Sequence, residues 1–74
     1  MTTLDARGLK CPLPVLKARK AMKDVAPGAL LTVLSTDASA PKDFEHFCAV
    51  TGHQLVESSV ADGVYKFVLK KAAA

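Results

Sequence analysis

Residues 8–15 read GLKCPLPV and mark the boundary between an expected first strand and an expected first helix. A residue before a proline is pushed out of the α region, and proline suits the start of a helix because its missing N–H needs no partner there. Pro12 is therefore predicted at the first helical position, with Cys11 at the N-cap. The sulfur is then expected to face the free amides of Leu13 and Val15.

The surroundings of Cys11 predict an exposed thiol with a lowered pKa. The N-terminal end of a helix favours negative charge, and the thiolate is the nucleophilic form of cysteine. Residues 1–23 carry a net charge of +5, against +3 for the whole chain. An unreactive, buried capping cysteine is the alternative, and the basic surroundings and the two prolines favour the reactive one.

Working outward from this stretch, the hydrophobic pattern predicts four strands and two helices. The expected strands are 3–6, 29–35, 53–60 and 64–70, and the expected helices are 12–25 and 41–51. The order βαβαββ predicts an α+β two-layer sandwich, with two helices packed on one face of a four-stranded mixed sheet. Residues 1–74 are expected to form one domain, because 74 residues suffice for a single small core.

The first helix has one apolar face and one basic face. At 100° per residue the predicted core positions are Val15, Ala18, Ala21, Met22 and Val25. Two further leucines fall among the charged residues, either as ordinary surface or as a docking patch. Their closeness to Cys11 favours docking, so the predicted partner-docking residues are Leu13, Leu16, Lys17, Arg19 and Lys20.

The second helix carries an apolar stripe formed by Phe44, Phe47, Cys48 and Thr51. Cys48 is therefore interpreted as a small buried hydrophobic residue rather than a resolving cysteine. His46 and His53 are expected at the surface, and neither has a ligand-spaced partner. We expect no metal site and no cofactor.

Several classes of protein are disfavoured by what the sequence lacks. There is no glycine-rich phosphate loop, and no protease or thioredoxin spacing surrounds Cys11. The chain is also short for an enclosed substrate pocket. An exposed thiol without a deep cleft favours a carrier that exchanges sulfur with other proteins over a self-contained enzyme. With no signal segment and no long apolar run, we expect a cytoplasmic protein without membrane association.

Residues 4–15, followed by Arg19-Lys20, resemble the opening of the TusA/SirA-like sulfur-carrier family. The similarity continues through Pro27-Gly28, residues 37–43, Phe47-Cys48, residues 53–55 and Asp62-Gly63. The resemblance implies the same βαβαββ fold and makes Cys11 the persulfide-carrying residue. It also implies a structural clamp at Pro12 and Pro14, flanking motif positions at Asp5, Gly8 and Lys10, and a partner-guiding role for Arg19 and Lys20.

The resemblance further implies two kinds of protein partner. A cysteine desulfurase or rhodanese-type donor would load Cys11, and a downstream acceptor would remove the sulfur. The pathway stays open between tRNA thiolation, molybdenum-cofactor synthesis and other sulfur trafficking. Leu13 stands where the tRNA-thiolation members carry an acidic residue.

Two alternatives remain at this point. One is a small basic nucleic-acid-binding module, which the scarcity of aromatic residues disfavours. The other is a regulatory interaction module in which the cysteine has no chemical role.

Overall fold

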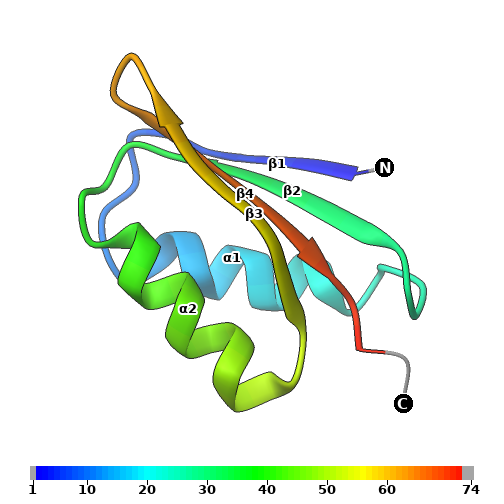
Figure 1. The fold of residues 1–74 in the computed structure, drawn as a ribbon. Coiled ribbons are helices and arrows are strands. Elements are labelled where there is room, and N and C mark those ends of the chain that lie inside the picture. Colours follow the sequence, from blue (N-terminus) through cyan, green and yellow to red (C-terminus); the bar gives the residue numbers. More distant parts are fainter. Residues whose placement is uncertain (1, 73–74) are drawn as a thin grey trace.

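The computed structural model describes residues 2–72 and confirms the predicted fold (Figure 1). The elements are β1 (Thr2–Ala6), α1 (Leu13–Met22), β2 (Leu30–Ser35), α2 (Ala40–Thr51), β3 (Gln54–Ala61) and β4 (Val64–Lys70). The sheet has the order β1-β2-β4-β3, in which β1 runs parallel to β2 and β4 runs antiparallel to both neighbours. Both helices cover the same face of this sheet (Figure 1).

The core lies between the helices and the two central strands. Phe44 of α2 stacks on Phe67 of β4 with ring centroids 4.6 Å apart, and both side chains are fully buried. Phe47 is only 6% exposed, so neither phenylalanine of α2 offers a free surface on which a nucleic-acid base could stack. Other fully buried positions are Ala18, Leu31, Val33 and Leu69.

The predicted helix faces are largely confirmed. Ala18, Met22 and Val25 are buried, while Val15 and Ala21 are partly buried against the core. On α2 the prediction holds for the two phenylalanines and Cys48 but is wrong for Thr51, which is exposed. Thr51 is the last residue of α2, and its hydroxyl donates to the Phe47 carbonyl oxygen at 2.7 Å instead of packing inward.

The first helix ends three residues earlier than predicted. The amides of Lys23, Asp24 and Val25 each donate to the carbonyl oxygen three residues back, at 3.0–3.3 Å. Bonds of this spacing tighten the chain relative to an α-helix, so α1 closes in successive turns rather than continuing to Val25. Of residues 2–72, no helical segment has the length and apolarity that a bilayer crossing requires.

Candidate functional site

Cys11 is an exposed, free cysteine, but it does not cap α1. The N-cap is Pro12, whose carbonyl oxygen accepts from the Leu16 amide at 3.0 Å. The Leu13 amide donates to the carbonyl oxygen of Lys10 at 2.9 Å and is therefore not directed to the sulfur. The predicted N-cap position of Cys11 is wrong by one residue, and the Cys11–Pro12 peptide bond is cis.

The backbone of Cys11 is held by the loop that connects β2 to α2. Its amide donates to a carboxylate oxygen of Asp37 at 2.6 Å. The Asp37 carboxylate also accepts hydrogen bonds from the amide and the hydroxyl of Ser39, at 3.2 and 2.9 Å. The Ser39 hydroxyl also lies 3.3 Å from a carboxylate oxygen of Asp43, in the first turn of α2. Cys11 is therefore packed against two carboxylates from another part of the chain.

These carboxylates reverse the predicted electrostatics of the thiol. The pKa of Cys11 is raised, first by a hydrogen bond to Asp43 and then by desolvation and by the negative charges of Asp43 and Asp37. A hydrogen bond with Ser39 opposes this effect without cancelling it. The predicted lowering of the pKa is wrong. It counted the charges that are close to Cys11 in sequence, whereas the carboxylates that act on the sulfur lie 26 or more positions away in the chain and approach it only in the fold. The predicted exposure of Cys11 is confirmed.

Sequence reasoning missed Asp37, Ser39 and Asp43 as site residues. The signal that could have found them is the parallel pairing of β1 with β2, which places the loops after both strands at one edge of the sheet. The two loops are tied there by the Gly8 amide, which donates to the Thr36 hydroxyl at 2.9 Å.

The flanking motif residues shape the loop that presents Cys11. Asp5 forms an exposed ion pair with Arg7 at 2.9 Å, and this partner lowers the Asp5 pKa to about 2. Gly8 adopts φ 81°, a left-handed conformation that side chains disfavour. The pKa of Asp37 is lowered first by the hydrogen bonds that it accepts from Ser39 and Cys11 and, to a smaller extent, by the positive charge of the exposed Lys10. Pro14 is buried in the first turn of α1.

An open groove of about 360 Å³ runs between α1 and α2 and includes Cys11, Pro12 and Asp43. Its walls include Val15, Leu16 and Arg19 from α1, and His46, Phe47 and Val50 from α2. Two of the predicted docking residues, Leu16 and Arg19, line the groove. Leu13, Lys17 and Lys20 are exposed outside its lining. Leu16 and Val50, 50% and 70% exposed, give an apolar surface to the groove that Cys11 also lines.

The two histidines differ from each other. His46 is exposed as predicted and lines the groove. His53 is half-buried rather than fully at the surface, because its ring packs 5.8 Å from that of Phe47 and its Nδ1 accepts from the Ala72 amide at 2.9 Å.

Among residues 2–72, one group of side chains is spaced closely enough to surround a metal ion. The sulfur of Cys11 and carboxylate oxygens of Asp37 and Asp43 lie within 4.8 Å of one another. Asp37 already accepts hydrogen bonds from Cys11 and Ser39, and we assign no ion to the group. The expectation of no metal site stays a prediction.

Similarity to known proteins identifies the family of this chain. The family described as "Sulfurtransferase TusA" matches residues 2–71. The chain belongs to the TusA sulfurtransferase family. A protein of Neisseria meningitidis serogroup B is 54% identical over 68 residues, which cover 92% of both chains. The sulfur carrier protein TusA of Allochromatium vinosum is 44% identical over 69 residues, covering 93% of this chain and 91% of that protein.

A solved structure agrees with the fold. The crystal structure of the SirA-like protein from Desulfitobacterium hafniense superposes with a TM-score of 0.86 and 30% sequence identity. The match covers 97% of this chain and 99% of that one. The predicted family is confirmed, and with it the sulfur-carrier function, which implies a sulfur donor and a sulfur acceptor as partners.

Proposed function

We propose that the chain carries sulfur as a persulfide on Cys11. The Cys11 thiolate attacks the outer sulfur of a donor persulfide, so that a new S–S bond forms and the donor leaves as a thiolate. An acceptor thiolate later attacks the outer sulfur of Cys11–S–SH and restores the Cys11 thiolate. The transferred sulfur keeps its oxidation state in both steps, so neither step needs an added oxidant or reductant.

The observation that supports this assignment is the contrast in access between the two cysteines. Cys11 is exposed and lines the groove, whereas Cys48 is 7% exposed and belongs to the core. Transfer between two proteins requires the sulfur to reach a second cysteine directly, which a core residue cannot do without unfolding. The raised pKa of Cys11 limits the fraction of thiolate at neutral pH, so we expect docking to accelerate loading by a protein donor.

The groove is the proposed docking surface for these partners. Leu16 and Val50 offer apolar contact area in the same groove as Cys11, and Arg19 adds a positive charge. The exposed cations Lys17 and Lys20 on the same helix favour a partner with acidic groups around its own cysteine. We propose a cysteine desulfurase or a rhodanese-type protein as the donor, acting in a reducing cytoplasm where both cysteines stay free.

Mass spectrometry of the intact protein tests the loading step. We expect incubation with a cysteine desulfurase and cysteine to add the mass of one sulfur atom, and peptide mapping to place it on Cys11. Sulfur found on Cys48, or none on either cysteine, would contradict the proposal.

Two matched leucine variants test the docking surface. Leu13 and Leu16 are 45% and 50% exposed, but only Leu16 lines the groove. We expect Leu16→Ser to slow loading by the desulfurase about tenfold, equivalent to about 1.4 kcal/mol of lost contact, and Leu13→Ser to have a much smaller effect. Loading by inorganic polysulfide, which needs no docking, should proceed equally in both variants. Equal effects of the two variants on enzymatic loading would contradict the groove as the docking surface.

A further inference from the structure

The polar and charged groups that surround Cys11 or share its groove come from four parts of the fold. Asp37 and Ser39 come from the loop between β2 and α2, and Lys10 precedes Cys11 in its own loop. The groove adds Asp43 and His46 from α2 and Arg19 from α1. Of the charged groups, the two carboxylates are those that act on the sulfur, and both disfavour its negative charge.

The two carboxylates have different tasks. Asp37 is occupied by the Cys11 amide and by both donors of Ser39, so it fixes the backbone of the loop. Asp43 is half-buried in the first turn of α2, and one of its carboxylate oxygens lies within 4.8 Å of the Cys11 sulfur, close enough for its negative charge to act on the thiol. The Ser39 hydroxyl lies within hydrogen-bonding distance of both carboxylates, and an oxygen of each carboxylate lies within 4.8 Å of the Cys11 sulfur.

We propose that Asp43 is a positioning residue that retains sulfur on Cys11 by disfavouring the thiolate that must leave when the sulfur is passed on. This inference rests on the proposed persulfide at Cys11. In the transfer step a thiolate R–S⁻ attacks the outer sulfur and forms R–S–SH. The bond between the two sulfur atoms of the persulfide breaks, and its electron pair stays on Cys11 Sγ. Water then supplies the proton that restores the thiol.

The physical reason lies in the identity of the leaving group. A thiol with a lower pKa leaves faster in sulfur exchange, and one with a higher pKa leaves more slowly. Asp43 raises the pKa of Cys11 both through its hydrogen bond and through its charge. Small thiols in solution therefore remove sulfur from Cys11 slowly, and the loaded carrier persists until an acceptor binds.

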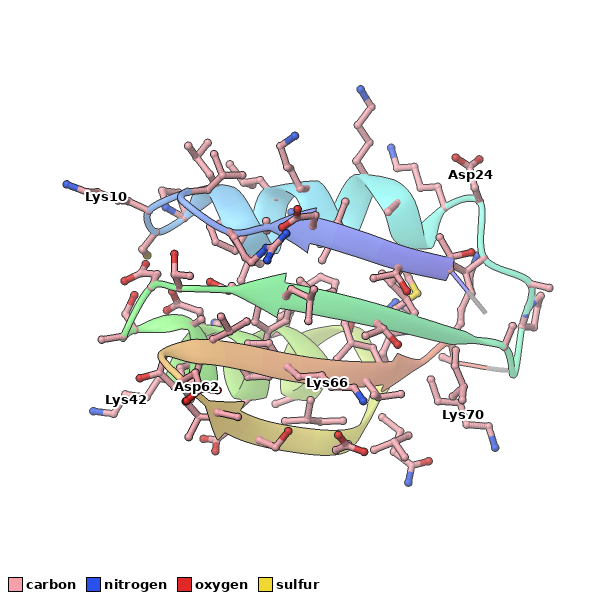
Figure 2. All side chains as sticks on the ribbon, turned by 90° about the horizontal axis from the view of Figure 1, so that it is seen from above. Lys10, Asp24, Lys42, Asp62, Lys66 and Lys70 are labelled. Atoms are coloured by element: carbon pink, nitrogen blue, oxygen red, sulfur yellow. The ribbon has the colours of Figure 1, made fainter. Side chains whose placement is uncertain are left out.

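The test compares sulfur loss to a small thiol. Wild type, Asp43→Asn and the control Asp24→Asn are loaded with inorganic polysulfide, freed of excess reagent and treated with 2-mercaptoethanol. Loss of one sulfur atom is followed by intact mass. Asp24 is exposed and lies at the far end of α1 from Lys10, so its variant makes the same charge change away from Cys11 (Figure 2).

We expect Asp43→Asn to lose sulfur faster than wild type, and Asp24→Asn to match wild type. We take the exchange rate to depend on the pKa of the leaving thiol about as steeply as on that of the attacking thiol. A fall of one unit in the pKa of Cys11 should then accelerate sulfur loss about threefold. The pH midpoint for iodoacetamide alkylation of unloaded Cys11 should move down in Asp43→Asn only. Asp43→Glu, which keeps the charge, should restore slow loss.

Unchanged sulfur loss or an unchanged midpoint in Asp43→Asn would overturn the inference. Failure of wild-type Cys11 to take up sulfur would instead overturn the proposed function.

Discussion

Cys11 and Cys48 have thiol pKa values shifted in the same direction for different reasons. Burial raises the pKa of Cys48, which is 7% exposed beside the phenylalanines of α2. Cys11 is exposed, and the hydrogen bond to Asp43 is the largest cause of its raised pKa. A shift toward the neutral thiol therefore says little about function until its cause is known.

The two causes differ in how easily they are removed. Desolvation of Cys48 lasts as long as the core stays packed, because only 7% of this residue is exposed. Asp43 lines the open groove beside Cys11, where a bound protein or one substitution can change the charge that acts on the sulfur. The pKa of Cys11 can therefore be changed by a bound partner, whereas the pKa of Cys48 is fixed by the packed core.

The largest expected effect comes from removing each cysteine in turn. Cys11→Ser should abolish persulfide loading, because a serine hydroxyl cannot form the S–S bond. Cys48→Ala should load as wild type does, since Cys48 is only 7% exposed and belongs to the core. Intact mass after incubation with polysulfide measures both. Residual loading of Cys11→Ser would show that Cys48 is accessible and would break the distinction.

For the free energy of unfolding we expect the opposite ranking, with the larger effect from substituting Cys48 and the smaller from substituting Cys11. Cys48→Ala removes a buried sulfur packed in the core and should cost about 1–2 kcal/mol of unfolding free energy. Cys11→Ala changes an exposed side chain and should stay within about 0.5 kcal/mol of wild type. Urea unfolding followed by circular dichroism measures both values. A larger cost at Cys11 than at Cys48 would contradict this comparison.

The burial of Cys48 could be predicted from sequence because helix periodicity is a local property. The spacing of Phe44, Phe47 and Cys48 places all three on one face of α2, and the structure buries all three. The order of helices and strands along the chain follows in the same way, since the hydrophobic pattern of each segment identifies it independently of the others. The fold was thus accessible from local patterns.

The environment of Cys11 could not be predicted in this way, because it depends on contacts between distant segments. The local cues at Pro12 and Pro14 indicated a helix start correctly to within one residue. The pKa of the thiol is raised instead by Asp43 and Asp37. These residues lie close to Cys11 only because β1 and β2 pair in parallel. A count of basic residues near Cys11 in sequence therefore gave the wrong sign.

The smallest expected effect is a loss of stability at alkaline pH that both cysteines share. Their folded-state pKa values lie above the ordinary value of 9.0, so the folded protein keeps thiol protons that the unfolded chain releases. Stability from these groups is complete below pH 9.0 and falls as the pH rises from there through the folded pKa values.

Urea unfolding at about pH 8 and about pH 10 should show a smaller decline for Cys48→Ala than for wild type, although the variant is less stable at both. Asp43→Asn should also reduce the decline, by removing the main cause of the Cys11 shift. An equal decline in wild type and both variants would mean that neither thiol is shifted, and the contrast between a removable and a fixed cause would then have no basis.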